Sequence, residues 1–395
     1  MKQKIKDLAA KYAGDFVANR RHLHSHPELS FHEFETQKFV ATQLQALGLS
    51  PIPMADTGLV ALIEGRNPSK KVVGLRADMD ALPILEANDV TYKSQNPGVM
   101  HACGHDVHTA SLLGVARILT ELKDEFEGTV KLVFQPGEEK APGGASMMIR
   151  EGVLQNPAPF EMIGQHVAPQ IPVGKIGFRE GMYMASTDEI YLTVRGKGGH
   201  GAAPELGVDP VLMASHIIVA LQQVISRNRP QDSPSVLSFG KVIANGATNV
   251  IPNEVKIDGT YRCMNESWRE EGLRRIRKIA EGLAESMGGS CEVEVVKGYP
   301  YLENHPELTC RLRAETSDYV GEENIIDLDI WMAGEDFAFY SQVVDSCFYR
   351  LGTRNEARGI VSGVHTPTFD VDEQALEIGA GLMSWLAIRE LENAN

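Results

Sequence analysis

Residues 109–134 read TASLLGVARILTELKDEFEGTVKLVF, and the stretch holds two elements of different periodicity. Its first part, 109–122, carries apolar residues at helical spacing, whereas 129–134 is a short apolar run typical of a buried strand. Another short apolar run, 72–75, lies upstream of both. A strand, a helix and a strand in this order predict a βαβ unit, whose two strands lie parallel in one sheet.

The alternation continues on either side of this unit. Parallel strands that are covered on both faces have apolar runs, and such sheets bind ligands beyond the carboxyl ends of their strands. We therefore expect an α/β domain with a mostly parallel sheet flanked by helices. Its other predicted elements are helices at 4–20, 32–47 (ending at Gly48) and 144–150, and strands at 59–63 and 162–167.

After Gly181 the pattern becomes that of a second, smaller α+β domain. Half-exposed antiparallel strands are predicted from alternating polarity, and two helices from helical periodicity. The stretches near 174–181 and 298–306 contain glycine and proline, which are common where a chain crosses between domains. The smaller domain is thus expected as an insertion at 184–297, between larger-domain parts at 1–183 and 298–395. The predicted strands are 189–194 and 254–262, the helices 210–225 and 268–284, and helix-like segments then lead to a last helix at 372–392.

The composition narrows the classes of partner. The 395 residues include 38 Lys and Arg against 53 Asp and Glu, a net charge of −15. This balance argues against nucleic acid and anionic membrane surfaces, and no stretch approaches the roughly 20 apolar residues that span a bilayer. A small molecule or a protein is the expected partner.

The cysteines and the N-terminus predict the compartment. Five cysteines lie singly along the chain, unlike the dense even sets of small secreted scaffolds, so they are interpreted as thiols. The N-terminus, MKQKIKD, is charged and is followed by a helix pattern rather than by the apolar core of a signal peptide. We expect a cytoplasmic protein.

The densest group of reactive side chains is MHACGHDVHT, residues 100–109. Thiolate and imidazole are ligands that borderline metals prefer. Cys103 and His105 lie two residues apart, so in an extended segment both face one side and can share a metal. A catalytic metal site is favoured over a Cys/His nucleophile pair, a structural zinc site or inert packing. His101 and His108 are expected to be held by hydrogen bonds rather than to ligate.

A second group, Gln135-Pro136-Gly137-Glu138-Glu139, follows the predicted strand 129–134. Adjacent carboxylates at a strand end point to opposite sides. One can therefore bind a metal while the other takes a proton from water, which is the division that metal-assisted hydrolysis needs. By itself the pair would be read as a solvated turn, and the neighbouring Cys/His group reverses that interpretation.

Further residues fit the same scheme. His166 ends a predicted strand, His365 precedes the last helix, and Asp78 and Asp80 follow strand 72–75, where they can orient ligating histidines. Each of them also has a structural explanation. The run His22-Leu23-His24-Ser25-His26 closes a helix before Pro27 and is interpreted as structural, whereas the glycines of 196–201 would let His200 reach a ligand.

Over nearly its whole length the chain resembles the M20 metallopeptidase family, in particular its aminoacylase-like amidohydrolases, which act on hippurate and indoleacetyl amino acids. The resemblance implies that a pair of divalent ions is bound and that Glu138 is the general base. The implied metal ligands are Cys103, His105, Glu139, His166 and His365.

The resemblance also assigns roles outside this ligand set. Asp78 corresponds to the family's aspartate behind the metal ligands. In the inserted lid or dimerisation domain, His200, Asn249 (in Thr248-Asn249-Val250-Ile251-Pro252) and Arg262 correspond to positions of substrate binding and dimer contact. Gly334 and Glu335, in Gly334-Glu335-Asp336-Phe337, match a motif near the pocket.

The chain departs from the wider family at one point. Many members have His-x-Asp and a bridging Asp, whereas this chain has Arg76-Ala77-Asp78 and Cys103, as the aminoacylase-like branch does. The metal therefore stays open, because thiolate favours zinc while the other ligands also suit manganese, cobalt or nickel.

The expected activity is hydrolysis of N-acyl amino acids by a homodimer or higher homo-oligomer. His200 is expected to help stabilise the oxyanion of the reaction, and the resemblance suggests that a neighbouring subunit supplies it. The first alternative is a dipeptidase or carboxypeptidase with the same two-metal site. A thiol hydrolase using Cys103 and a metal-stabilised binding protein are the others.

Overall fold

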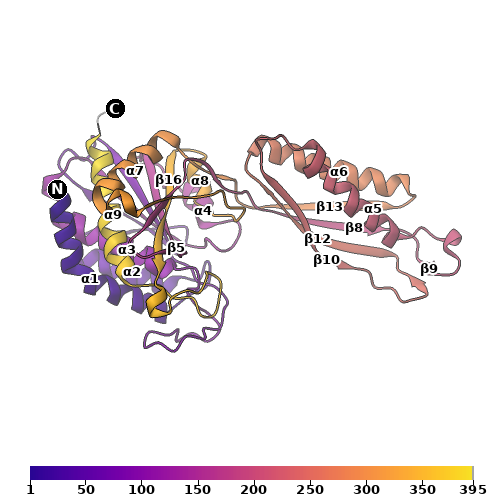
Figure 1. Ribbon diagram of the computed structural model, residues 1–395, viewed down its shortest axis with the longest axis horizontal. Helices are drawn as coiled ribbons and strands as arrows, with labels where there is room; N and C mark the ends of the chain where they lie inside the picture. The colour runs from indigo at the N-terminus through magenta and orange to yellow at the C-terminus, as the bar shows by residue number, and fades with distance from the viewer. Residues whose placement is uncertain (394–395) are drawn as a thin grey trace. The chain divides into compact units, whose positions relative to one another are not determined.

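The computed structural model describes residues 1–393 and divides into two compact units, which are described separately (Figure 1). The first comprises 1–181, 303–329 and the chain from Asp336 onward, and the second comprises 182–302 and 330–335. The insertion expected at 184–297 lies within the second unit, which also takes in 298–302 and 330–335.

The first unit is built on an eight-stranded sheet of order β1-β2-β4-β3-β5-β16-β6-β15. Its centre is parallel, since β3 pairs in parallel with β4 and β5, and β16 with β5. The predicted α/β class with a mostly parallel sheet is confirmed. The strands are β1 (Ile52–Met54), β2 (Gly58–Glu64), β3 (Val72–Asp78), β4 (Thr129–Gln135), β5 (Glu161–Pro172), β6 (Ile176–Phe178), β15 (Ile325–Asp327) and β16 (Asp345–Arg354).

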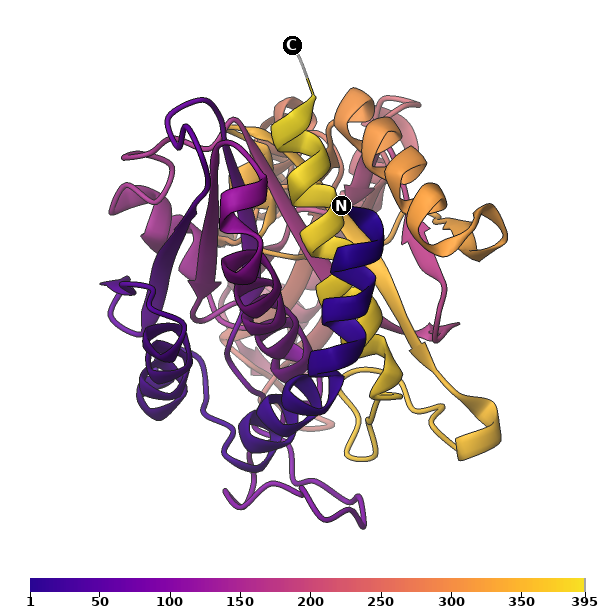
Figure 2. The same ribbon diagram turned by 90° about the vertical axis from the view of Figure 1, so that its left-hand side faces the viewer.

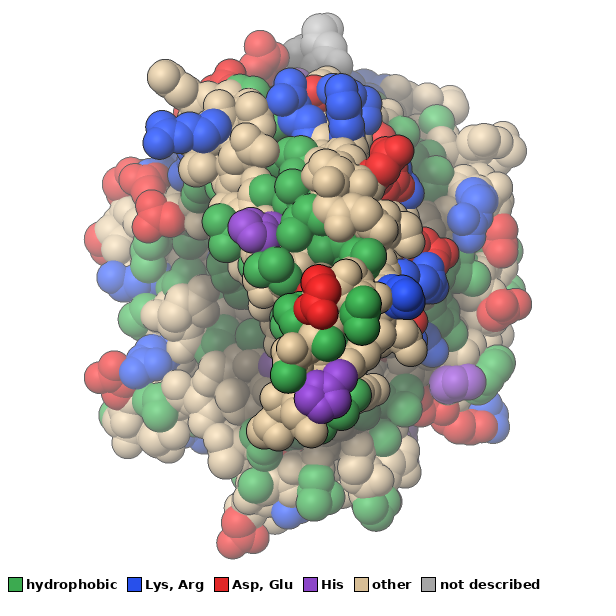
Figure 3. All heavy atoms as spheres, turned by 90° about the vertical axis from the view of Figure 1, so that its right-hand side faces the viewer, with side chains coloured by type: hydrophobic (Ala, Val, Ile, Leu, Met, Phe, Trp, Pro, Cys, Tyr) green, Lys and Arg blue, Asp and Glu red, His purple; other side chains and the backbone are tan. Residues whose placement is uncertain are grey.

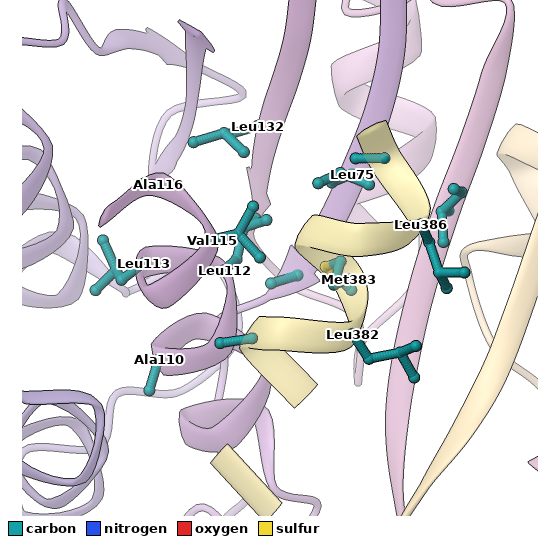
Figure 4. Packing of buried hydrophobic residues seen from close by; sticks show 14 of the residues in the cluster. Leu75, Ala110, Leu112, Leu113, Val115, Ala116, Leu132, Leu382, Met383 and Leu386 are labelled. Carbon is teal, nitrogen blue, oxygen red and sulfur yellow. The ribbon is translucent and has the colours of Figure 1, made fainter. Parts of the chain in front are cut away.

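Helices cover this sheet, and every residue of β3 and β4 is buried. The first, third and last helices contact one another, and Leu75 and Leu132 of the sheet lie beside Leu112 and Met383 of two of them (Figures 2 and 4). The helices are α1 (Lys2–Ser25), α2 (Phe34–Ala46), α3 (His105–Glu121), α4 (Gly144–Arg150), α7 (Pro306–Val320), α8 (Ala338–Ser341) and α9 (Gln374–Glu392).

The second unit is an antiparallel sheet of order β10-β12-β8-β13, with two helices that contact it. Its core includes Leu192, Ile217, Ile257 and Ile276. The elements are β8 (Asp188–Arg195), α5 (Pro210–Gln223), β10 (Ser235–Ile243), β12 (Glu254–Cys263), α6 (Glu266–Ser286) and β13 (Ser290–Lys297), with a small ladder of β9 (Gly199–His200) and β11 (Val250–Ile251).

Shorter elements complete the chain. β7 (Gly181–Met184) pairs with β14 (Leu302–Asn304). Short helical turns lie at Lys123–Glu125, Pro204–Leu206, Val224–Asn228, Glu322–Asn324 and Glu356–Arg358. Among the described residues, no helix is long and apolar enough to cross a membrane.

The predicted elements coincide with observed ones, but the expectation of only helix-like segments between 306 and 372 is wrong. β15 and β16 lie there. β16 reads DSCFYRLGTR, and its buried arginine, Arg350, breaks the apolar run that marks a central strand.

Candidate metal centre

The predicted ligands of the first unit meet at one edge of its sheet. Asp78 ends β3, Gln135 ends β4 and His166 lies in β5, and these three strands run parallel. The carboxyl ends of parallel strands lie at the same edge, and in such sheets this edge binds the ligand. His105 is the first residue of α3, which packs against β3 and begins at the same place.

Cys103 and His105 are brought together by a turn rather than by an extended segment. Gly104 between them has φ +81°, and a Cβ at this position would lie 2.5 Å from Cγ2 of Val167. Only glycine combines this backbone conformation with this close approach. The expectation of an extended segment is wrong because α3 begins directly at His105.

The five predicted ligands form overlapping groups whose ligand atoms lie within 4.8 Å of one another. One group is Cys103, His105 and His166, and another is Cys103, Glu139 and His365. Cys103 Sγ lies 3.5 Å from His166 Nε2, and His365 Nε2 lies 3.2 Å from Glu139 Oε1. Cys103 therefore belongs to both groups.

His365 has an unusual backbone. Its φ is +60°, in the left-handed region that residues with side chains rarely adopt, and its N–H donates to Ala102 O at 2.7 Å. Such conformations persist where the surroundings fix them, and they are concentrated at functional sites. The hydrogen bond ties the His365 loop directly to the residue before Cys103.

The donor set fits divalent cations. His105 Nε2 is buried, and no hydrogen-bond partner for it is found among residues 1–393. Buried polar atoms are nearly always paired, so this nitrogen indicates a missing partner. Thiol, imidazole and carboxylate groups lie around this nitrogen, and together they are ligands that suit a borderline metal ion.

Two aspartate side chains contact the Nδ1 atoms of His105 and His108. Asp80 Oδ1 lies 3.1 Å from His105 Nδ1, and Asp78 Oδ1 lies 2.5 Å from His108 Nδ1. Nε2 of His108 accepts from the N–H of Val167, the residue after His166. Asp80 thus contacts Nδ1 of the predicted ligand His105, whereas Asp78 lies 3.7 Å from Nε2 of the same ring and also contacts His108. His108 is held by hydrogen bonds as expected.

His101 differs from the prediction. It is 1% exposed, and neither ring nitrogen has a hydrogen-bond partner among the described residues. Burial lowers its pKa to about 4, so the ring is neutral at pH 7. The predicted hydrogen bonds are therefore not found in the part of the chain that the structure describes.

The pKa values bear on the alternative chemistries. Burial, assisted by the nearby Glu139 carboxylate, raises the pKa of the Cys103 thiol. A nucleophilic cysteine needs the opposite shift, which argues against a thiol hydrolase. Burial also holds the pKa of His166 well below its usual range, with Arg350 adding to the effect, so its imidazole is neutral as a ligand must be.

Glu138 belongs to the same cluster. Its carboxylate groups with His105 and Glu139, and the side chain is 7% exposed. Its Oε1 accepts from the backbone N–H of Asp336 at 3.4 Å. The two adjacent glutamates therefore both reach the cluster, Glu139 beside His365 and Glu138 beside His105.

The sequence pattern of peptidase family M20/M25/M40 matches residues 74–389. The chain belongs to this family. Its M20 relatives include proteins named as an IAA-amino acid hydrolase and an N-acetylcysteine deacetylase, and this chain is likewise an amidohydrolase.

Two M20 relatives and one solved structure are similar over nearly the whole chain. The IAA-amino acid hydrolase ILR1-like 4 of Arabidopsis thaliana is 38% identical, covering 95% of this chain and 85% of that protein. The N-acetylcysteine deacetylase of Bacillus subtilis is 37% identical, covering 94% and 96%. The Bacillus subtilis YXEP protein, a dinuclear metal binding peptidase from the M20 family, has a TM-score of 0.84 at 33% identity, covering 98% and 100%.

The M20 motif residues of the second unit form two pairs. His200 pairs with Val250 in the β9–β11 ladder, and the N–H of Gly201 donates to Asn249 O. Arg262 lies near Gly334, where a Cβ would approach Arg262 Nη1 to 3.6 Å and Thr187 Cγ2 to 2.2 Å. Glu335, which follows Gly334, is buried.

These two pairs lie far apart within the second unit. β11 precedes the start of β12, whereas Arg262 lies near the end of β12. At about 3.3 Å per residue, the eight residues from Glu254 to Arg262 span roughly 25 Å. Within this unit the structure does not bring His200 to Arg262.

Sequence reasoning missed a buried ion network beneath the M20 centre. Arg20 Nε donates to Asp106 Oδ2 at 2.8 Å, and His24 lies between Asp106 and Glu86. Arg20, His24 and Asp106 have fully buried side chains. Apolar periodicity marks such helix positions as core without showing their partners, which lie 62 to 86 residues away.

Proposed function

We propose that this enzyme hydrolyses the amide bond of N-acyl amino acids and releases a carboxylic acid and a free amino acid. The similarity to an IAA-amino acid hydrolase and to an N-acetylcysteine deacetylase supports this substrate class. The observation that supports the catalytic part is the buried Nε2 of His105. No hydrogen-bond partner for this atom is found among residues 1–393, and it lies 3.7 Å from Asp78 Oδ2 and 4.0 Å from Glu139 Oε1.

Two divalent cations are proposed as cofactors. The ligand set is Cys103, His105, Glu139, His166 and His365, as the overlapping groups and the similarity to a dinuclear metal binding peptidase support. Zinc or manganese is the favoured metal, with cobalt and nickel as further candidates, because the set mixes one thiolate with imidazole and carboxylate.

Glu138 is proposed as the general base. Bound divalent cations polarise an amide carbonyl and lower the pKa of water at the site. Glu138 accepts the proton that water loses on attack and passes it to the leaving nitrogen, so that the amine departs neutral. Its burial beside His105 keeps bulk water from competing for that proton. Asp78 contributes indirectly, by holding His108.

Arg262 is proposed to hold the substrate carboxylate. Its Nε donates to Thr260 Oγ1 at 3.0 Å, which orients the guanidinium. A planar guanidinium binds a carboxylate through two parallel hydrogen bonds. Gly334 and Glu335 adjoin this position, and the missing Cβ of Gly334 leaves room for Thr187.

His200 and Asn249 are proposed to serve the site of a second copy of the chain, in a homodimer formed through the inserted domain. Their distance from Arg262 within one unit supports this. So do the apolar side chains at the surface of the second unit, several of which face the viewer in Figure 3. The exposed ones on α5 and β10 include Leu212, Val219, Val242 and Ile243.

The cytoplasm is the proposed location. All five cysteines are free thiols, four of them buried, which suits a reducing compartment.

A substrate panel tests the proposed class. The metal-loaded enzyme is assayed on N-acetyl and N-benzoyl amino acids and on the matching unblocked dipeptides, with release of free amino acid as the readout. We expect higher kcat/KM on the acylated substrates. Preference for the dipeptides would instead favour the peptidase alternative, to which the similarity to a structurally known peptidase gives weight.

A further inference from the structure

The loop between β4 and α4, residues 136–143, carries both glutamates of the proposed centre. Its two ends lie against each other: the N–H of Gly144 donates to Gly137 O at 3.1 Å. A Cβ on Gly144 would lie only 1.7 Å from Pro136 O. The loop is therefore closed at its base, where Gln135 ends β4 and Ala145 enters α4.

One buried carboxylate joins these two flanking residues. Asp336 is fully buried, and its Oδ2 accepts from the backbone N–H of Ala145 at 3.0 Å. The side-chain amide of Gln135 donates to both Asp336 oxygens, at 2.8 Å each. The same side chain thus contacts the residue before the loop and the second residue after it.

The charge of Asp336 is compensated within the same network. Nη2 of Arg76 donates to Asp336 Oδ1 at 2.7 Å, and Nε of Arg76 donates to Gln135 Oε1 at 3.0 Å. Nη1 of the same arginine donates to Asp78. Arg76 thus pairs with both buried carboxylates, Asp336 and Asp78, and a buried ion network of this kind has essentially one arrangement.

We propose that Asp336 is the positioning residue of the Glu138–Glu139 loop. By fixing both ends of the loop, it sets where the base and the carboxylate ligand stand relative to the cysteine and histidine ligands. Glu33 and Asp80 hold the interior of the loop, through the N–H groups of Gly137 and Glu139, but neither contacts its flanking residues Gln135 and Ala145. The inference rests on the proposed roles of Glu138 and Glu139.

The variant Asp336→Asn tests this most selectively. An amide keeps the size of the carboxylate but has one oxygen, so it cannot accept from Arg76 and Gln135 on one side and from Ala145 N–H on the other. We expect a fall of about 10- to 100-fold in kcat and a similar loss of metal affinity, the usual effect of removing a group that supports ligands. KM should change little, because Asp336 is proposed to act only through the loop.

A readout independent of catalysis is amide hydrogen exchange. In Asp336→Asn, peptides covering 136–145 should exchange faster, while peptides from β16 should not change. Gln135→Met, which removes only the amide donor at one end, should give the same pattern to a smaller extent. If Asp336→Asn does not fold, Gln135→Met tests the proposal in its place.

Glu390→Gln is the matched control. Glu390 is also fully buried and accepts from an arginine, Arg311, but this pair adjoins Glu161, the first residue of β5, five residues before His166. It should leave exchange in 136–145 and metal affinity unchanged.

Unchanged exchange in 136–145, with metal affinity and kcat near those of wild type in folded Asp336→Asn, would overturn the proposal. Its failure is distinguishable from that of the proposed function. If Glu138→Gln turned over normally, the base assignment would fall, while exchange and metal affinity would still report on Asp336.

Discussion

One carboxylate oxygen of Asp80 lies 3.1 Å from His105 Nδ1, and the other accepts a hydrogen bond from the backbone N–H of Glu139 at 2.9 Å. A single buried side chain thus orients two proposed ligands from different elements. It also fixes the tautomer of His105, since a proton held at Nδ1 leaves the lone pair of Nε2 facing the cluster.

Asp80→Asn should therefore weaken metal binding by about 10- to 100-fold, because the amide can satisfy only one of these contacts. Metal affinity is measured by competition with a chromophoric chelator. Asp56→Asn, at an exposed turn position, is the control and should bind as wild type. Equal affinities for the two variants would contradict the role given to Asp80.

Glu138→Gln should keep its metal and lose turnover. Glutamine has the shape of glutamate but takes up no proton, and general acid–base catalysis contributes roughly 100- to 10,000-fold. The measurement pairs kcat with elemental analysis of the same sample. Normal metal content with near wild-type kcat would remove the base assignment.

Cys103 should be protected from alkylation by bound metal. In the metal-free protein the thiol is 8% exposed and free to react slowly, whereas a ligated sulfur is blocked. Peptide mass spectrometry after iodoacetamide treatment compares it with exposed Cys310, which should react in both forms, and with fully buried Cys347, which should react in neither. Equal labelling of Cys103 with and without metal would exclude it as a ligand.

Arg20 and Arg21 are adjacent and should differ sharply in their effect on stability. Arg20→Met leaves Asp106 buried without its cation, which typically costs about 3–5 kcal/mol of unfolding free energy. Arg21 pairs with Glu373 at the surface, where such a pair contributes about 0–1 kcal/mol. Urea unfolding of the two methionine variants measures the difference, and equal losses would contradict it.

Glu161 should make stability fall as pH rises. Burial and the neighbouring Glu390 raise its pKa from 4.5 to about 8, although Arg311 contacts both carboxylates. Between these pH values the folded chain holds a proton that the unfolded chain releases, so this stabilisation is complete below pH 4.5 and is lost towards pH 8.

Glu161→Gln should accordingly show a smaller drop in urea midpoint between pH 5 and pH 8 than wild type. Exposed Glu294→Gln should follow the wild-type curve. Parallel curves for wild type and Glu161→Gln would show that Glu161 has an ordinary pKa.

Local patterns in the sequence predicted most of the helices and several central strands, because one-sided burial gives a helix or strand a regular spacing of apolar residues. The run at 129–134 is β4, the helix at 109–122 is most of α3, and the insertion has the expected strands and helices. β10 was not predicted, since it is largely exposed and its polarity follows no clear alternation. β16 was missed because Arg350 is buried within it.

The residues of the candidate site divide in the same way, into those that a local sequence motif marks and those that only folding brings together. Cys103, His105 and Glu139 could be proposed from the sequence because each stands in a dense local motif at an element end. The contact of Asp336 with Gln135 joins residues 201 positions apart, and the pairing of Arg20 with Asp106 spans 86. No periodicity links such residues, so only the folded chain shows these contacts.

Removal and restoration of metal test the central claim most directly. The purified enzyme is analysed for bound metal, stripped with a chelator, and assayed on an N-acyl amino acid before and after zinc or manganese is restored. We predict two divalent ions per chain, no hydrolysis by the stripped protein and recovery when metal is returned. Undiminished hydrolysis by protein that elemental analysis shows to be free of metal would contradict the account.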